Sequence, residues 1–141
     1  MSEKIKIEEL PVTDLFLRRK RLIQDRGELA LIEDGVSIRH LGYFSLKKGN
    51  DYFRGGHFHE KKIERFYIIS GKLRLHFVDL ETGTRGEVQV RDGMCVAIHP
   101  KCAHRFSAVE DAQVIEYYDS DYDPDDDMRY DFSVLMEARE P

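Results

Sequence analysis

Alternation of hydrophobic and polar residues recurs in short stretches along most of the chain. Residues 3–9, 36–49, 72–80 and 86–93 place an apolar side chain at about every second position, which is the period of a β-strand with one buried face. Glycine-containing turns separate these stretches, and no convincing amphipathic helix lies between them. The pattern predicts about seven or eight strands and an all-β fold, a single small antiparallel β-barrel or jelly roll.

Residues 36–49 form the longest of the strands predicted in the first half of the chain. Counting in twos places His40 on the same face as Val36, Ile38, Phe44 and Leu46, which we take as the interior. A core histidine is the more frequent reading of such a position, and a functional histidine the less frequent one. By the same count Arg39 and Tyr43 face outward, unless a bulge at Gly42 reverses the phase.

The later strands follow the same count. Leu73, Leu75 and Phe77 are predicted to face inward and His76 outward, which makes His76 the least favoured ligand. Gly71 is expected to mark the turn before this strand. Asp25, Arg26 and Gly27 are expected to form an earlier turn, and a turn over residues 81–84 leads to the strand at 86–93.

The two ends of the chain extend beyond a core barrel predicted for residues 20–118. Residues 3–9 read as an edge strand because Pro11 follows them. Two partners are open to this strand: the edge of the chain's own sheet, or another subunit, which would give a homodimer. Residues 119–141 form a tail with five aspartates between 121 and 127. We expect a solvated acidic loop, without the glycine and glutamate of a calcium loop, and then a short helix.

Length and charge narrow the class of protein. The 141 residues suit one domain, residues 1–141, with a real hydrophobic core. The net charge is −5 and basic residues are dispersed among acidic ones, which argues against a nucleic-acid partner. The chain has two cysteines, no apolar run of membrane-spanning length and no charged-then-apolar leader. A reduced, cytoplasmic protein with no membrane partner is the expectation.

Candidate chemistry gathers in two stretches. Residues 57–71 carry the pattern H-x-H-x4-E-x6-G, with His57 and His59 two apart and therefore on one face of a strand. Taken alone, the pattern also suits a hairpin with two surface histidines. The second stretch, residues 93–106, combines a glycine, a short apolar strand, a proline and His104. Two such strand pairs are what an antiparallel barrel needs to bring imidazoles together at its mouth.

These stretches resemble the paired signature of the cupin superfamily over roughly residues 36–118. The resemblance implies a metal site with His57, His59, Glu64 and His104 as ligands. The second half departs from the family pattern at His99, Lys101 and Ala108. Three imidazoles and one carboxylate suit one divalent transition metal, whether zinc, iron, manganese or nickel, and leave coordination positions open.

Within the superfamily, two sugar-processing groups are most similar. R-G-x-H-x-H at 54–59, D-R-G-x-L at 25–29 and Y-x-x-D-Y at 118–122 resemble sugar-nucleotide 3,4-ketoisomerases, which use paired histidines without a metal. H-x-H-x4-E-x-F-x3-S-G resembles the metal-bearing cupin domain of capsular polysaccharide biosynthesis enzymes. Glu64 and His104 together favour the metal-bearing form.

The resemblance implies proton transfer at a carbon beside the ketone of a nucleotide-linked sugar, by an isomerase or epimerase. The candidate acid or base groups are His57, His59 or His104, if free of metal, and Tyr43 or Tyr118. Arg26, Arg54, His40 and Arg105 are the candidate residues for binding an anionic, sugar-like substrate. For Arg26 a nucleotide contact and a solvated basic face weigh equally.

Two other functions fit the same residues. A non-haem iron or nickel dioxygenase uses the same four ligands and needs a drier, more apolar pocket. A cupin that binds a small ligand without turnover, or acts as a sensor, needs no catalytic group at all.

Overall fold

Nearly every ordered element of the protein is a β-strand. The computed structural model describes residues 2–133. The strands are β1 (Ile5–Glu9), β2 (Lys20–Gln24), β3 (Gly27–Leu31), β4 (His40–Leu46), β5 (Gly49–Phe58), β6 (Glu64–Asp79), β7 (Arg85–Arg91), β8 (Met94–Ile98), β9 (Cys102–Tyr118) and β10 (Met128–Arg129), and the 3-10 helix η1 (Pro124–Asp126) precedes the last of them. The all-β class predicted from the alternation is confirmed.

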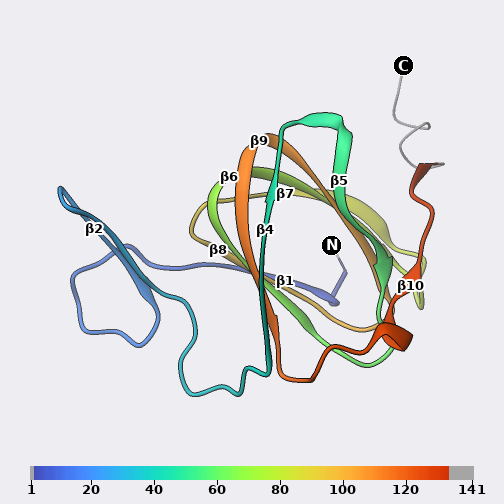
Figure 1. Cartoon of the computed structure of the whole chain (residues 1–141), viewed down its shortest axis with the longest axis horizontal. Helices are drawn as coiled ribbons and strands as arrows, with labels where there is room; N and C mark the ends of the chain where they lie inside the picture. Colours follow the sequence, from blue (N-terminus) through green and yellow to red (C-terminus); the bar gives the residue numbers. More distant parts are fainter. Residues whose placement is uncertain (1, 134–141) are drawn as a thin grey trace.

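The two longest strands, β6 and β9, pair with each other and run through both layers of a jelly roll. The first half of β6 pairs with β8, which pairs with β1, and the second half of β9 pairs with β4. The second half of β6 pairs with β7, and the first half of β9 pairs with β5, which pairs with β10. Figure 1 shows these strands curving around a common interior. Among residues 2–133 the pairing follows an open path from β1 to β10 and does not close into a ring.

Gly71 lies where β6 passes from one layer to the other. Its φ is +92°, and a Cβ atom there would come within 2.2 Å of the carbonyl oxygen of Asp111 on β9. The register between β6 and β9 shifts on either side of this point. The expectation of a turn at Gly71 was therefore wrong: the residue is a bend inside one continuous strand, where only glycine fits.

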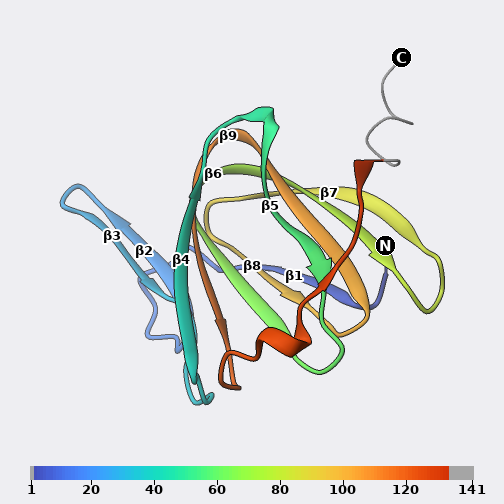
Figure 2. The same cartoon turned by 45° about the vertical axis from the view of Figure 1, so that its right-hand side comes forward.

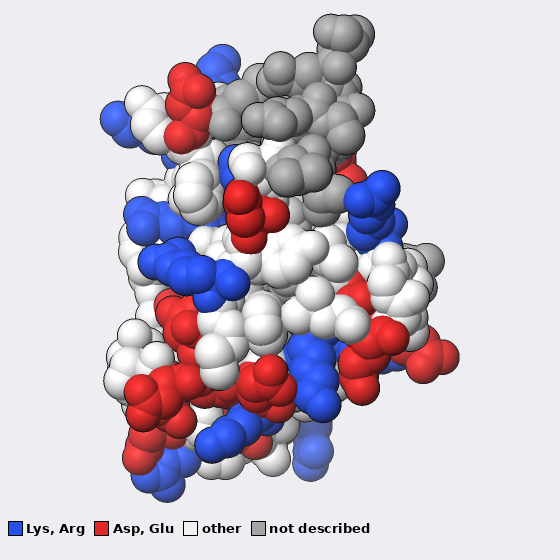
Figure 3. Space-filling model, turned by 90° about the vertical axis from the view of Figure 1, so that its right-hand side faces the viewer, with Lys and Arg blue, Asp and Glu red and all other residues white. Residues whose placement is uncertain are grey.

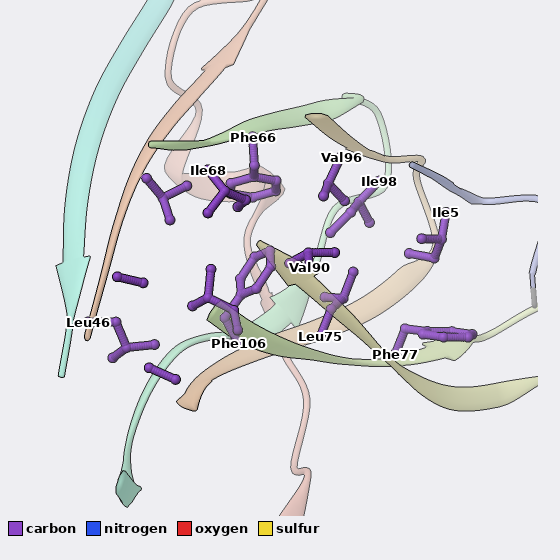
Figure 4. Close-up of a cluster of buried hydrophobic side chains, with 14 of the residues drawn as sticks. Ile5, Leu46, Phe66, Ile68, Leu75, Phe77, Val90, Val96, Ile98 and Phe106 are labelled. Carbon is purple, nitrogen blue, oxygen red and sulfur yellow. The ribbon is translucent and has the colours of Figure 1, made fainter. Parts of the chain in front are cut away.

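Side chains from both layers fill the interior. Figure 4 shows the main cluster, in which Leu75 and Phe77 of β6 meet Val96 of β8 and Phe106 of β9. The inward orientation of Leu73, Leu75 and Phe77 is confirmed. His76 was expected to face solvent, but it is buried on the other face of the sheet. Its ring nitrogens lie 3.4 Å from Glu87 Oε2 and 3.4 Å from Ser107 Oγ, because side chains from β7 and β9 cover it.

The strand predicted for residues 36–49 is shorter than its sequence pattern. It begins at His40, and Val36 and Ile38 are exposed. The physical reason is the partner strand: β9 ends at Tyr118, which is the residue opposite His40. Along β4 itself the alternation holds, with Leu46 buried and Tyr43 exposed.

The opening strand β1 finds its partner within the chain. It pairs antiparallel with β8, with Ile5 opposite Ile98. Asp79 at the end of β6 accepts hydrogen bonds from Ser2 Oγ at 2.8 Å and Lys4 Nζ at 2.6 Å. Of the two partners open to this strand, the edge of the chain's own sheet is the one observed. Because β1 is the end strand of that sheet, pairing of its other edge with a second subunit stays a prediction.

The hairpin formed by β2 and β3 is a separate two-stranded sheet. Its two-residue turn, Asp25 and Arg26, lies where the sequence predicted it. Figure 1 shows the hairpin projecting at the left of the view, while Arg21 at its base pairs with Asp92 after β7. The hairpin and the loop before it carry a set of exposed apolar side chains, here called the hairpin patch: Val12, Leu15, Phe16, Leu17, Ile23 and Leu29.

Charge is dispersed over the surface as the sequence suggested. On the face in Figure 3, Lys and Arg side chains alternate with Asp and Glu side chains. No helix in residues 2–133 has the length and apolar character needed to cross a membrane.

Candidate functional site

Two histidines, a glutamate and a third histidine converge from three strands. His57 lies near the end of β5 and pairs across the sheet with His104 of β9. His59 follows β5 directly, and Glu64 begins β6. One nitrogen or oxygen atom from each of the four lies within 4.8 Å of all the others. The structure thus brings together the four residues that the sequence singled out.

Glu64 is the centre of this cluster. Its Oε1 atom lies 2.8 Å from His104 Nε2, 3.3 Å from His59 Nε2 and 3.8 Å from His57 Nε2. Burial opposes the charge of Glu64, but the three imidazoles outweigh it and hold the pKa of the carboxyl well below its usual range. Burial also acts against a charged His59, yet Glu64 raises the pKa of that imidazole. Glu64 therefore stays ionised at neutral pH.

The donor set fits a divalent metal ion. Among the described residues, His59 Nε2 is buried and makes no well-aligned hydrogen bond, although Glu64 Oε1 lies 3.3 Å away. Ligand atoms about 2.0–2.2 Å from a shared ion lie about 3 to 3.5 Å apart, and the contacts to Glu64 bracket that range. An ion held by the four side chains would give His59 Nε2 a well-aligned partner.

A cavity of about 220 Å³ opens over the cluster. His57, Glu64 and His104 form part of its wall. The other lining residues are Tyr43, Phe44, Arg54, Gly55, Phe66, Phe106 and Glu116. The cavity therefore joins an imidazole and carboxylate cluster to an aromatic wall and a cationic side chain, which is the mixed lining typical of a site for a small polar ligand.

Glu116 is the lining residue that the sequence reasoning missed. Burial, followed by the nearby charge of Glu64, raises the pKa of its carboxyl. Its Oε1 atom lies 3.9 Å from His40 Nε2. The signal was present in the strand at 112–118, where Glu116 shares its face with the buried residues Ala112 and Val114. A carboxylate on an apolar, inward face is a candidate functional residue.

Comparison of the sequence with the patterns of known protein families identifies the family of this chain. The pattern of the polysaccharide biosynthesis C-terminal domain matches residues 24–129, about three quarters of the chain. The chain belongs to this family. No curated protein sequence matches it significantly.

Several solved structures of similar fold are sugar-nucleotide enzymes. The 3,4-ketoisomerase QdtA of Thermoanaerobacterium thermosaccharolyticum, in complex with TDP, superposes with a TM-score of 0.74 at 18% identity, over 99% of this chain and 97% of that one. The dTDP-4-dehydrorhamnose 3,5-epimerase of Sulfolobus tokodaii superposes with a TM-score of 0.75 at 17% identity, over 94% of this chain and 80% of that one. A 3,4-ketoisomerase of Helicobacter canadensis superposes with a TM-score of 0.71 at 14% identity, over 95% of this chain and 96% of that one. These likenesses confirm the cupin-like jelly roll.

In this polysaccharide biosynthesis C-terminal domain, two of the predicted substrate and proton-transfer residues line the cavity in addition to the histidines of the cluster. Tyr43 and Arg54 both contribute to its wall. The Arg54 guanidinium donates two long hydrogen bonds, each 3.4 Å, to the carbonyl oxygen of Ser45, and it stays exposed. Arg54 is therefore free to meet an anionic group at the mouth of the cavity.

His40 and Tyr118 form a stacked pair beside Glu116. Their ring centroids are 4.2 Å apart and the rings are nearly parallel. Lys62 lies on the Tyr118 ring, with its Nζ atom 3.8 Å from the ring centroid. Burial, with Glu116 next, raises the pKa of Tyr118 to about 12. The raised pKa keeps the Tyr118 hydroxyl protonated at neutral pH, which favours a role as a proton or hydrogen-bond donor over one as a base.

Arg26 and Arg105 lie apart from the cavity. Arg26 is at the exposed tip of the β2–β3 hairpin, where its Nε donates to Gln24 Oε1 at 2.8 Å. Arg105 alternates with His104 along β9 and so faces the opposite side of the sheet. There its guanidinium covers the Phe53 ring at 4.1 Å, and burial lowers its pKa. Neither is among the described residues that line the cavity.

The acidic segment after β9 is only partly the solvated loop that the sequence suggested, because Asp121 and Asp125 are exposed but Asp126 is buried. Asp126 is only 3% exposed, and its carboxylate accepts hydrogen bonds from the main-chain N–H groups of Glu60 at 2.6 Å and Lys61 at 3.3 Å. The prediction failed because these partners lie more than sixty residues away in the sequence. The short helix expected at the end of the chain falls mostly on residues 134–141, outside the described part.

Proposed function

We propose that the protein binds one divalent transition metal through His57, His59, Glu64 and His104, and that it isomerises or epimerises a nucleotide-linked sugar at a carbon beside a ketone. The observation that carries the proposal is the convergence of four ligand atoms within 4.8 Å at the wall of a cavity. The family and the solved ketoisomerases and epimerase of the same fold support the substrate class. Fold alone would not carry it, because one fold hosts many chemistries.

A carbon beside a ketone is a weak acid, so its proton leaves only if the enolate oxygen is stabilised. A bound divalent ion would supply that stabilisation as a Lewis acid. The chain's own residues supply the rest. Since all three histidines of the cluster are proposed as ligands, proton transfer falls to Glu116, which lines the same cavity. Arg54 at the mouth is proposed to bind the anionic part of the substrate.

The test is solvent proton exchange. Metal-loaded protein is incubated with dTDP- or UDP-4-keto-6-deoxyglucose in deuterated water, and the sugar is followed by proton NMR. We expect deuterium to enter at the carbon beside the ketone, and His104→Ala to abolish that exchange. Absence of both exchange and a new sugar would refute the proposal for these substrates. Oxygen consumption with small diketones would then favour the dioxygenase, and ligand binding without turnover a binding protein.

We also propose that the protein is a cytoplasmic homodimer. The hairpin patch supports it, because Phe16 is fully exposed and five other apolar side chains lie around the same projecting hairpin. Exposed apolar patches of this kind mark interaction surfaces. This support comes from the β2–β3 hairpin and the loop before it, and it adds to the sequence argument from the opening strand.

A further inference from the structure

The C-terminal segment returns to the site after leaving β9. Strand β10 pairs antiparallel with β5, placing Met128 opposite Phe58 and Arg129 opposite His57. The main-chain N–H of Tyr130 donates to the carbonyl oxygen of Gly56 at 2.9 Å. Figure 2 shows η1 and the segment after it, in red, passing beside the end of β5. The backbone of the acidic segment is thereby fixed next to the two neighbouring histidines.

This segment contacts the Nδ1 atoms of both histidines. His57 Nδ1 lies 2.9 Å from Asp127 Oδ1, in ion-pair range although not in line for an ideal hydrogen bond. His59 Nδ1 contacts the main-chain carbonyl oxygen of Asp126. On both rings the Nε2 atom is left facing Glu64. An imidazole that donates from Nδ1 presents the lone pair of Nε2 to a metal, so the segment selects the ligating tautomer.

In His104, as in His57 and His59, the Nδ1 atom lies beside an oxygen acceptor and Nε2 faces Glu64. Its Nδ1 lies 3.0 Å from the carbonyl oxygen of Cys102, two residues away on the same strand. The third histidine is thus oriented by its own strand, whereas His57 and His59 depend on a segment nearly seventy residues further along the chain.

The Asp126 carboxylate explains how the carbonyl contact is kept in place. It is buried and accepts from the main-chain N–H groups of Glu60 and Lys61, the residues that follow His59. Burying a carboxylate is costly unless it is hydrogen-bonded, so the two N–H groups fix its position. The loop after β5 and the turn at η1 are therefore held together, with His59 between them.

We propose that the acidic C-terminal segment is part of the metal centre: the Asp127 side chain and the Asp126 carbonyl orient His57 and His59 so that both present Nε2 to the ion. The two aspartates are positioning residues and do not themselves contact the ion. This inference rests on the proposed metal centre, and it assigns a role to a segment whose sequence indicated only a solvated loop.

The experiment measures cobalt(II) affinity by chelator competition in the full chain. We expect Asp127→Ala to weaken binding about 10- to 100-fold. Asp127→Asn keeps an acceptor beside His57 and is expected to recover much of the loss. Asp125→Asn is the matched control, because Asp125 is exposed on η1, and its affinity should stay within about threefold of the wild type. Equal affinities for Asp127→Ala and Asp125→Asn would overturn the inference while leaving the metal centre intact.

A second readout needs no metal. Nitrogen-15 NMR of the metal-free protein at about pH 8.5, above the ordinary pKa of imidazole, reports which ring nitrogen carries the proton. We expect His57 to be protonated at Nδ1 in the wild type and to shift toward a mixture of tautomers in Asp127→Ala. Thermal unfolding of the same variant shows whether it folds. Protonation at Nε2 in the folded wild type would overturn the inference even if the chain binds no metal, and a wild type that binds no cobalt would overturn both proposals.

Discussion

A buried carboxylate and a half-buried one in the site have pKa values shifted in opposite directions by their surroundings. Glu64 is held ionised because three imidazoles outweigh its burial. Glu116 has one histidine at 3.9 Å, and there burial raises the pKa of the carboxyl. Pairs of acids whose pKa values are pushed apart usually divide the work between binding and proton transfer. The opposite pKa shifts therefore distinguish Glu64, the proposed metal ligand, from Glu116, the proposed base.

Glu116→Gln tests that division. The change removes the proton-accepting oxygen and keeps the shape of the side chain. We expect the rate of deuterium incorporation into the ketosugar to fall about 10²- to 10⁴-fold, while cobalt affinity stays within about threefold. In the wild type the rate should decrease as the pH falls below the raised pKa of Glu116, because the base must be ionised. A rate within tenfold of the wild type would assign proton transfer to another group.

Gly71→Ala tests the bend in β6. The new Cβ would meet the Asp111 carbonyl oxygen at 2.2 Å and force a positive φ on alanine. We expect a loss of at least about 3 kcal/mol in the free energy of unfolding, measured with urea. Gly83→Ala is the control, because Gly83 also has a positive φ but has no atom within 4 Å of the added Cβ. Its loss should be about 1 kcal/mol, and equal losses would contradict the steric argument.

At the scale of elements, the sequence predicted what depends on local alternation. The inward residues of β6 and the turn at Asp25 and Arg26 were found because strand period and turn chemistry are local. Features set by distant partners were missed. Residues 102–118 form one strand through both layers, and Asp126 is buried by the loop at residues 60–61. Neither feature can be recognised from the residues adjacent to it in the sequence.

Asp79→Asn tests how firmly β1 is held. Asp79 is buried, and hydrogen bonds led by that of Lys4 hold its pKa well below the usual range. A depressed pKa contributes stability that is fully present above the unfolded value of about 3.9 and is lost as the pH falls through the folded value. We therefore expect the variant to be less stable by about 2 kcal/mol at pH 7, with a smaller difference at about pH 2 to 3.

Urea unfolding at several pH values measures this difference. Asp121→Asn is the matched control, since Asp121 pairs with Arg39 at an exposed site and should change stability little. A difference between Asp79→Asn and the wild type that stays constant down to pH 2 would show that the charge of Asp79 does not stabilise the fold.

For the whole molecule, the cupin-like jelly roll and the four clustered residues were predictable. The two sequence motifs, residues 57–71 and 93–106, resemble the paired cupin signature and fall on neighbouring strands. Asp127 was not, because it gains its place only when the C-terminal segment pairs with β5. Glu116 was missed although its strand carried the signal, since it shares a face with the buried residues Ala112 and Val114. Site residues recognised by spacing were found, and those recognised only by tertiary contacts were not.

The hairpin patch gives a prediction for the assembly. We expect a dimeric mass by light scattering at about 50 μM, because a projecting hairpin with this much exposed apolar surface favours a partner. Phe16→Asp and Ile23→Asp should shift the protein to monomer. Leu80→Asp, at an exposed apolar position outside the patch, should not. A monomeric wild type at this concentration would refute the homodimer. Deletion of residues 1–10 should unfold the jelly roll, because it removes the buried side chains of Ile5 and Leu10.

The metal content of the purified protein tests the central claim most directly. After expression with supplemented zinc, iron, manganese and nickel, elemental analysis should find about one divalent ion per chain. His57→Ala and His104→Ala should each abolish it, whereas His76→Ala should not, because His76 is buried against Glu87 and Ser107 away from the cluster. Less than about a tenth of an equivalent in the wild type, or equal metal content in the His104→Ala variant, would contradict a metal centre at these four residues.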